Sequence, residues 1–173
     1  MPPSRQICPP EHLTADHDLS QFQNGKHPSL DEWLRERALA CEGLSARTYV
    51  VCDAAARTRV IGYYALSTAM EERRALPTAK LRRSMPEQVP LLLISRLALD
   101  ATCQGYGVGT ELLSDALRRC QITSEIIGAR AVIAHAIDDA AMQFYSHHGF
   151  LLSPLGERVM LMPIEVVRRL FAD

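Results

Sequence analysis

Residues 95–117, SRLALD-ATCQGYGVG-TELLSDAL, carry the most informative pattern for the fold of this chain. An apolar run ends at Asp100, and glycines follow at positions 105, 107 and 109. Apolar residues then recur at the spacing of a helix. The pattern predicts a buried strand, a glycine turn and an amphipathic helix. The first N–H groups of a helix have no partner within it and lie at its positive end, so the turn is typical of an anion site.

Two common phosphate-binding motifs do not fit these glycines. A Walker A loop requires Gly-Lys followed by Ser or Thr, whereas Thr110 and Glu111 follow Gly109. A dinucleotide fingerprint requires G-x-G-x-x-G, and Gly105, Gly107 and Gly109 are spaced differently. From spacing alone, a tight strand-to-helix connection without a ligand explains the turn equally well.

Periodicity outward from this stretch predicts strands that alternate with helices. Ser29 and Glu32 form a capping-box pattern before the first helix, and Asp138 or Asp139 caps a later one. The alternation predicts a mixed α/β fold with parallel strands in the second half. The predicted helices cover residues 30–43, 110–126, 139–148 and 164–171, and the predicted strands cover residues 47–52, 59–67, 89–100, 130–137 and 158–162.

Length and composition favour one globular domain. The chain has 173 residues, of which 47% are apolar, so it is too apolar for a disordered chain. We expect a single domain over residues 1–173, with the polar, proline-rich residues 1–28 as an extended lead-in. No apolar run approaches the roughly 18 residues of a membrane span, and the N-terminus has no signal-peptide pattern. We therefore expect a cytoplasmic protein with no membrane partner.

The cysteines and histidines do not predict a metal site. The cysteines are five in number and show no CxxC spacing, which predicts reduced thiols. His147 and His148 are adjacent, and no cysteine or histidine lies near enough in sequence to suggest a ligand set. We expect no bound metal.

Basic side chains gather in residues 68–88, although the net charge of the whole chain is only −1. We predict a helix followed by a loop for this insert. Arginine has a flat, permanently charged fork that suits phosphate, so the cluster is either a nucleic-acid contact or a solvated surface. Its basic residues are Arg73, Arg74, Lys80, Arg82 and Arg83, against the acidic Glu71 and Glu72.

The segments together resemble the GCN5-related N-acetyltransferases, the GNAT family. The resemblance rests on Q-x-x-G-x-G at Gln104, Gly107 and Gly109, on the strand and helix around it, and on FYSHHGF at residues 144–150. It implies a mixed central sheet with splayed parallel strands, flanked by helices. It also implies acetyl-CoA as co-substrate, bound by backbone groups. The implied cofactor-binding residues are Leu97, Leu99, Gln104, Gly105, Tyr106, Gly107, Val108, Gly109 and Asp138.

From the sequence alone Tyr145 is better explained as an aromatic packing residue, but the resemblance implies a catalytic role for it. In the family pattern its hydroxyl is a proton donor to the leaving thiolate. Asp138 stands where many members carry an Asn that contacts the cofactor, but a helix N-cap explains it better. Candidate bases are His135, Glu71 and Glu72. An aminoacyl ester has an α-amine that is partly neutral near pH 7, so it needs no protein base.

A narrower resemblance covers nearly the whole chain from about Leu30. LDEWLRERA, RTYVVCD, VIGYYALS and AHAIDDAAMQFYSHHGF are similar to the GNAT toxins of bacterial type II toxin–antitoxin pairs. This implies acetylation of the α-amine of aminoacyl-tRNA, a block of translation and a ribbon-helix-helix antitoxin that alone contacts operator DNA. A homodimer is a further family expectation. The expected tRNA-binding residues are Arg73, Arg74, Arg82, Arg83 and Arg96.

Two other functions stay open at this point. One is acetylation of another amine, such as a protein N-terminus, a polyamine or a small molecule. The other is a partner-binding co-regulator of its own operon. A polyamine pocket should be acidic, and few acidic clusters lie near the expected groove. Trp33, in the first predicted helix, is interpreted as a core anchor.

Overall fold

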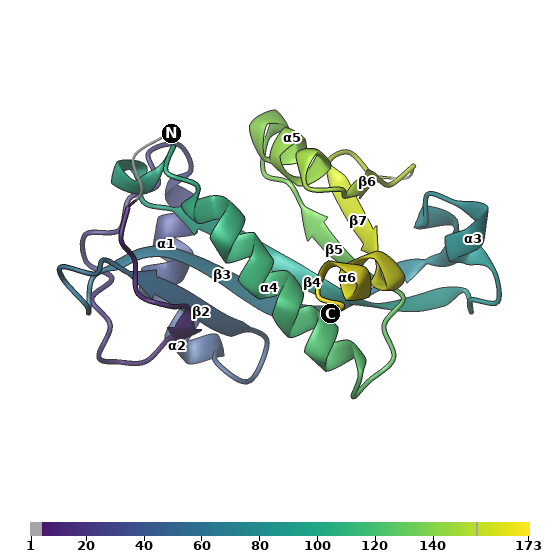
Figure 1. The fold of residues 1–173 in the computed structure, drawn as a ribbon, viewed down its shortest axis with the longest axis horizontal. Helices are drawn as coiled ribbons and strands as arrows, with labels where there is room; N and C mark the ends of the chain where they lie inside the picture. Colours follow the sequence, from purple (N-terminus) through teal and green to yellow (C-terminus); the bar gives the residue numbers. More distant parts are fainter. Residues whose placement is uncertain (1–4, 155) are drawn as a thin grey trace. The chain divides into compact units, whose positions relative to one another are not determined.

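A computed structural model describes residues 5–154 and 156–173 of the chain (Figure 1). The chain forms two compact units, Met1–Ser67 with Arg96–Ala116 (unit 1) and Thr68–Ser95 with Leu117–Asp173 (unit 2). Strands β3 (Val60–Glu72) and β4 (Gln88–Leu99) and helix α4 (Val108–Ser124) contribute residues to both units. The single domain expected from length stays a prediction.

The sheet is mixed, with the strand order β1-β2-β3-β4-β5-β7-β6. Strands β4 and β5 are parallel, whereas β7 is antiparallel to both β5 and β6. The parallel pairing predicted throughout the second half is therefore wrong for β7. A short strand, β6, escaped prediction, and β7 turns back after it to lie between β5 and β6. The remaining strands are β1 Glu11–His12, β2 Arg47–Cys52, β5 Ala131–His135, β6 Leu151–Leu152 and β7 Val159–Pro163.

The first predicted helix is two helices in the structure. Helix α1 (Pro28–Glu36) ends before Arg37, and α2 (Ala38–Cys41) follows. The predicted Ser29 capping box is wrong, because the helix already starts at Pro28 with His27 as its N-cap. The Asn24 side chain instead accepts the N–H of His27 at 2.7 Å. A proline at the first helical position needs no partner for an N–H, so the start can move upstream.

The predicted lead-in is part of unit 1 and packs against the strands of that unit. Strand β1 pairs with β2, and isolated bridges join Ile7 to Asp53 and Asp18 to Arg59. Leu13 is buried, and so is Phe22. The segment contains turns at residues 15–16 and 20–21, and it contributes to the core. Residues 1–4 of the predicted lead-in lie outside the described residues.

The insert at residues 68–88 begins as a strand, not as the predicted helix. Strand β3 continues to Glu72, where exposed and half-buried residues alternate. Two short turns of helix follow, η1 (Arg73–Ala75) and α3 (Ala79–Arg82). A two-residue alternation is the period of a strand, and pairing within a sheet overrode the weak local preference.

Two helices cover opposite faces of the unit 1 strands. On one face, Leu34 of α1 belongs to a core cluster with Tyr63 of β3 and Ala98 of β4. Trp33 packs against this cluster, as predicted for a core anchor, although it stays half-buried. On the other face, Gly62 of β3 lies against Leu112 of α4. Neighbouring strand residues face opposite ways, so β3 and β4 each serve both layers.

Unit 2 has a core of its own. Leu81 of α3, Leu91 of β4 and Leu161 of β7 are members of one buried cluster. Arg130 donates to the carbonyl of Leu81 at 3.2 Å and pairs with Glu165 at 2.7 Å. This guanidinium therefore ties α3 to helix α6 (Ile164–Leu170). The other helix of this unit is α5, Asp139–His147.

All five cysteines are free thiols, as the sequence predicted. Burial raises the pKa of Cys120 to about 12, and that of Cys52 to about 11. These thiols are therefore protonated and weakly reactive at neutral pH. None of the helices within residues 5–154 and 156–173 has the length and apolar character to cross a membrane.

The contact between Gly62 and α4 leaves no room for a side chain, which gives a first test. A Cβ at this position would lie 2.9 Å from Leu99, 2.9 Å from Val51 and 3.0 Å from Leu112. We expect Gly62→Ala to lower the free energy of unfolding in urea by about 1–3 kcal/mol through overpacking. Gly128→Ala is the control, since no atom lies within 4 Å of its Cβ position. Equal stability of the two variants would contradict the tight packing.

Candidate functional site

The glycine turn leads directly into helix α4. Gly105 and Gly107 have φ angles of 85° and 79°, a conformation that side chains rarely adopt. No atom lies within 4 Å of a Cβ built at either position. Backbone conformation, not crowding, therefore demands glycine here. The turn is exposed, so an anion can approach the first N–H groups of a 17-residue helix.

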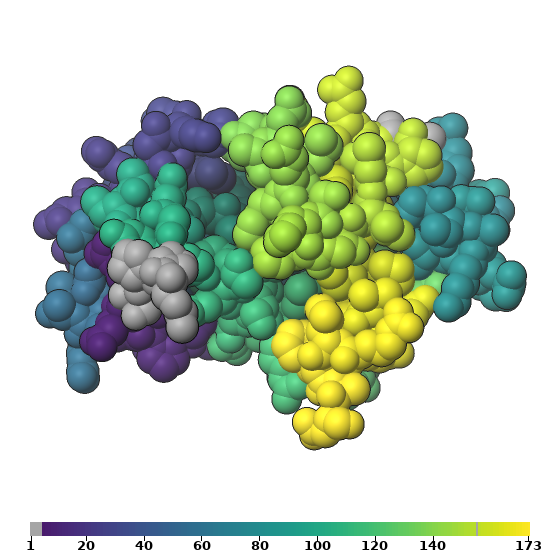
Figure 2. All heavy atoms as spheres, turned by 45° about the horizontal axis from the view of Figure 1, so that its top comes forward, coloured from purple at the N-terminus to yellow at the C-terminus, as the bar shows by residue number. Residues whose placement is uncertain are grey.

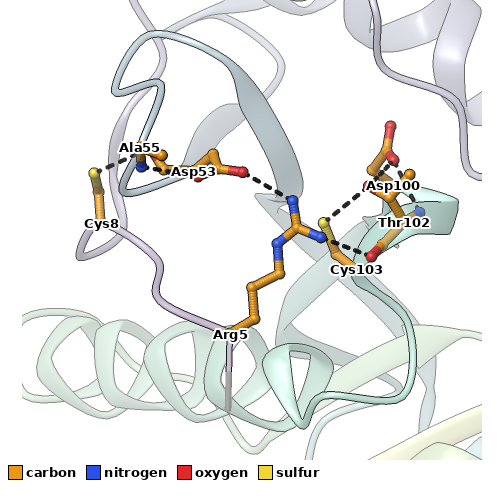
Figure 3. A network of polar contacts seen from close by, with 7 residues as sticks. All are labelled: Arg5, Cys8, Asp53, Ala55, Asp100, Thr102 and Cys103. Atoms are coloured by element: carbon orange, nitrogen blue, oxygen red, sulfur yellow. Dashed lines mark hydrogen bonds and ion pairs between the residues drawn. The ribbon is translucent and has the colours of Figure 1, made fainter. Parts of the chain in front are cut away.

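A hydrogen-bonded network fixes the chain at Asp100 and Thr102, just before the glycine turn (Figure 3). The Asp100 carboxylate, 3% exposed, accepts the N–H of Thr102 at 3.0 Å and the N–H of Gln23 at 3.1 Å. Arg5 donates to the Thr102 carbonyl at 2.7 Å and pairs with Asp53 at 2.8 Å. Segments that are far apart in sequence thus meet at the base of the glycine turn.

The hydrogen bonds of this network lower the pKa of Asp100. Burial alone would raise the pKa, but the bonds from Thr102 and Gln23 outweigh it and hold the pKa below its ordinary value. Gln104 adds a further support, because its side-chain N–H donates to the carbonyl of Asn24 at 2.9 Å. The side chain of Gln104 therefore fixes the turn, which leaves its backbone N–H as the group for a ligand.

Strand β4 extends beyond its pairing with β5. In the described part of the chain the parallel register ends at Ile94 opposite Ala134, while β4 runs on to Leu99. Leu97 and Leu99 therefore lie past the last β4–β5 pair and are half-buried. This is the strand arrangement that the predicted splay requires. Both leucines belong to unit 1, as do residues 104–109, which follow the end of β4.

Tyr145 belongs to α5, in unit 2. Its ring is 5% exposed and packs on Phe150, with 5.2 Å between ring centroids. Burial raises the pKa of its hydroxyl, so the group is protonated at neutral pH. Within the described chain this hydroxyl has no hydrogen-bond partner, whereas that of Tyr63 donates to Leu30 at 2.7 Å. Tyr145 is therefore a packed ring with a proton that no other protein group uses.

Asp138 and the candidate bases have other contacts. Asp138 is the N-cap of α5 and accepts the N–H of Ala141 at 2.8 Å, the role that the sequence favoured. Glu72 pairs with Arg74, whose hydrogen bond lowers the pKa of the carboxyl. His135 ends β5 and is exposed. No geometry among them identifies a base.

The basic insert lies on the surface, in teal in Figure 2, and its arginines differ in their contacts. Arg73 donates to the Met85 carbonyl at 2.8 Å, and Arg82 donates to that of Leu76 at 2.7 Å. Within residues 5–154 and 156–173, the side chain of Arg83 makes no hydrogen bond or ion pair, and only its backbone N–H is bonded, to the Ala79 carbonyl at 3.0 Å. Two of these guanidinium groups therefore shape the insert, and Arg83 is free to meet a phosphate.

Arg96 belongs to unit 1, whereas the insert residues belong to unit 2. Its guanidinium stacks over the ring of Trp33, 4.2 Å from the centroid. The structure thus divides the predicted substrate residues between the two units. The supporting residues Arg5 and Asp100 escaped the sequence analysis. The pattern Asp100-x-Thr102 is a recognisable turn signal, whereas nothing in the sequence marks Arg5.

The structure also contains a cluster of possible metal ligands that the sequence did not predict. Ligand atoms of Glu11, His17 and Cys52 lie within 4.8 Å of one another. The Thr14 N–H donates to Nδ1 of His17 at 2.9 Å, which leaves the ring proton on Nε2. Nε2 in turn lies 2.8 Å from the Glu11 carboxylate. Nε2, the nitrogen of His17 that faces the cluster, thus carries a hydrogen and cannot bind a metal. The arrangement therefore favours a hydrogen bond between His17 and Glu11 over a metal site.

Comparisons with known proteins agree on one family. Residues 45–151 match the family described as acetyltransferase (GNAT) domain. The tRNA-acetylating toxin of Mycobacterium tuberculosis (strain ATCC 25618 / H37Rv) is 39% identical over 166 residues, which cover 95% of this chain and 96% of the relative.

Solved structures give the same result. AtaT complexed with acetyl-methionyl-tRNAfMet has a TM-score of 0.87 and 28% identity, over 96% of this chain and 100% of that one. A tyrosine-to-phenylalanine mutant of AtaT, bound to the C-terminus of the antitoxin AtaR and acetyl-CoA, has a TM-score of 0.79 and 26% identity, over 97% of this chain and 99% of that one.

The network at Asp100 predicts a pH dependence of stability. A carboxyl whose pKa is depressed on folding stabilises the protein above its ordinary pKa of 3.8, and this contribution is lost as the pH falls through the lower folded value. We expect Asp100→Asn to be less stable than wild type by about 1 kcal/mol at neutral pH, with the difference shrinking in acid. Urea unfolding of both proteins, from neutral pH to below pH 3.8, measures this difference in the free energy of unfolding. The same change at exposed Asp16 is the control, and an Asp100→Asn difference that does not vary with pH would refute the network's role.

Proposed function

This chain belongs to the GNAT family of acetyltransferases, and from that membership we propose that it acetylates the α-amine of aminoacyl-tRNA and blocks translation as the toxin of a toxin–antitoxin pair. One observation carries the proposal: 39% identity over 95% of the chain to a relative named as a tRNA-acetylating toxin. The likeness to AtaT in complex with an acetylated aminoacyl-tRNA supports the same substrate class.

The glycine turn suits the anionic part of acetyl-CoA, which supplies the acetyl thioester. Gly105 and Gly107 leave open space over the backbone, and the N–H groups of residues 104–109 are the donors we assign to the pyrophosphate. Leu97 and Leu99 extend past the β4–β5 register. We therefore assign their backbone groups to the part of acetyl-CoA beyond the pyrophosphate. Asp138 is left out of this set because its carboxylate caps α5.

Tyr145 is the residue that we assign to proton transfer. As the amine nitrogen bonds to the acetyl carbon, the carbon–sulfur bond breaks and the sulfur leaves with the electron pair. The Tyr145 hydroxyl is protonated and unpartnered, so it can donate its proton to that sulfur. The attacking nitrogen loses its own proton to solvent. An α-amine is partly neutral near pH 7, so the reaction needs no protein base, in keeping with exposed His135 and paired Glu72.

Partners follow from the same proposal. Arg83 and its neighbours in the insert contribute affinity for tRNA phosphates, which does not depend on base sequence. Complexes of AtaT with the antitoxin AtaR support a cognate antitoxin, which we propose to be a ribbon-helix-helix protein that holds the operator DNA. We place the activity in the cytoplasm, where charged tRNA and acetyl-CoA occur. A homodimer remains a prediction.

The assignment of the glycine turn predicts the effect of a charge at Gly107. Gly107→Asp and Gly107→Asn strain the backbone alike, because both put a side chain at a φ of 79°. Only Asp adds a negative charge where the anion is to bind. We expect Asp to weaken acetyl-CoA binding about tenfold more than Asn in calorimetry, with the excess reduced by salt. Equal affinities in the two folded variants would contradict the assignment.

The role of Tyr145 predicts a loss of turnover without a loss of fold. Tyr145→Phe keeps the ring that packs on Phe150 and removes only the hydroxyl. We expect a drop of about 10²–10⁴-fold in single-turnover acetylation of charged tRNA, with unchanged acetyl-CoA affinity. Phe144→Leu is the packing control. A Tyr145→Phe rate within about twofold of wild type would show that Tyr145 only packs.

The same assay tests the substrate. Purified protein, acetyl-CoA and a mixture of charged tRNAs should yield acetylated aminoacyl-tRNA, and expression of wild type but not Tyr145→Phe should arrest growth. Acetylation of a polyamine or a peptide while charged tRNA stays unmodified would replace the proposed substrate.

A further inference from the structure

Arg96 is a half-buried cation without an anionic partner. It lies on β4, two residues past the last pair with β5 at Ile94. Of the residues whose structure is described, none forms a hydrogen bond or an ion pair with its guanidinium. The guanidinium packs flat on Trp33, 4.2 Å from the ring centroid. Partial burial weakens hydration of a charge, so an arginine in this position gains from an anion that arrives from outside.

An aromatic stack holds Arg96 in place. Trp33 stacks in turn on Tyr63, with 6.0 Å between centroids and 15° between planes. The Tyr63 hydroxyl is bound to the Leu30 carbonyl at 2.7 Å, which fixes the second ring. The buried carboxylate of α1, Asp31, accepts two N–H groups of Asn24, at 3.0 Å and 2.7 Å. The stack therefore orients the guanidinium, and the buried acid of α1 is engaged elsewhere.

The position of Arg96 separates it from the donor-binding turn. Residues of β4 alternate between the two faces, so Arg96 lies with Ala98 on the face that α1 covers. Leu99 lies on the opposite face, with Gly62 and the helix that the glycine turn opens. Both faces belong to unit 1, at the same strand end. A second substrate that approaches β4 from the α1 face would meet Arg96, while the donor is held by the turn.

We propose that Arg96, positioned by Trp33, binds a backbone phosphate near the 3′ end of the acceptor tRNA. This rests on the proposed function. The reacting end of aminoacyl-tRNA carries an amine and an ester, so its negative charge comes from the phosphates next to it. A guanidinium that is stacked by its face keeps its N–H groups at the edge, in the plane that suits two phosphate oxygens.

The test compares two arginines that both stack on aromatic rings. Arg118 lies 5.3 Å from the ring centroid of Phe171 and belongs to unit 2, so Arg118→Gln is the matched control for Arg96→Gln. We expect Arg96→Gln to raise KM for charged tRNA about tenfold and to reduce the salt dependence by about one phosphate contact. Acetyl-CoA affinity and acetylation of an amino acid methyl ester, which has no phosphate, should stay at the wild-type level. Arg118→Gln should change none of these.

The positioning role of the Trp33 ring is tested separately. Trp33→Phe retains an aromatic face and should keep KM for charged tRNA close to wild type. Trp33→Leu removes the face and should raise KM as Arg96→Gln does. Thermal unfolding checks that each variant is folded, and Arg96→Lys, which keeps the charge but not the fork, decides the matter if Trp33→Leu does not fold. Its KM should lie between those of wild type and Arg96→Gln.

Three results would overturn the inference. KM for charged tRNA could be unchanged in Arg96→Gln, or activity on the ester could fall as much as activity on tRNA. Alternatively, affinity for an antitoxin C-terminal peptide could fall while tRNA kinetics stay unchanged, which would assign Arg96 to a protein partner. Failure of the proposed function is distinct, since wild type itself would then leave charged tRNA unmodified.

Discussion

The buried carboxylate of Asp100 is the interaction on which the candidate donor site depends. Burial of a charge is costly unless hydrogen bonds replace the lost water, and Thr102 and Gln23 supply them here. The same bonds fix the chain where β4 ends, and thus the direction in which the glycine turn enters α4. Because Gln23 and Arg5 come from the N-terminal segment, that segment is part of the site's support and not a separate lead-in.

Strand β4 supplies two chemically different faces and a free edge. Leu99 faces α4, where the absence of a side chain at Gly62 allows close packing. Arg96 faces α1, where Trp33 shields one side of its charge. Past Ile94 the register with β5 ends, so the backbone of β4 is no longer paired with β5, and the Leu99 carbonyl accepts a hydrogen bond from the side chain of Gln104 at 3.4 Å. Because side chains alternate along a strand, the two binding roles that we propose for this segment, toward acetyl-CoA and toward tRNA, fall on opposite faces of β4.

Three tyrosines show how partners separate structural from chemical roles. The hydroxyl of Tyr63 donates to a helix carbonyl, and that of Tyr64 donates to Asp115 of α4. These groups fasten helices α1 and α4 to β3. The hydroxyl of Tyr145 has no such bond in the described chain, and burial raises its pKa. A hydroxyl without a protein partner does not fasten its ring to a neighbouring element, which is in keeping with the proton-transfer role that we propose for Tyr145.

Local patterns were enough to predict the strand, glycine turn and helix at residues 95–117, the cap at Asp138 and the position of Tyr145 in α5, because these features depend on neighbouring residues. The turn was readable because glycine at a positive φ is a local backbone requirement. Tertiary structure decided the rest. Pairing placed β7 between β5 and β6 and continued β3 to Glu72, against the local patterns. The tertiary fold also bonds Arg73 and Arg82 to backbone carbonyls and stacks Arg96 on Trp33. Whether a charge finds a partner depends on residues distant in sequence, and no local pattern encodes that distance.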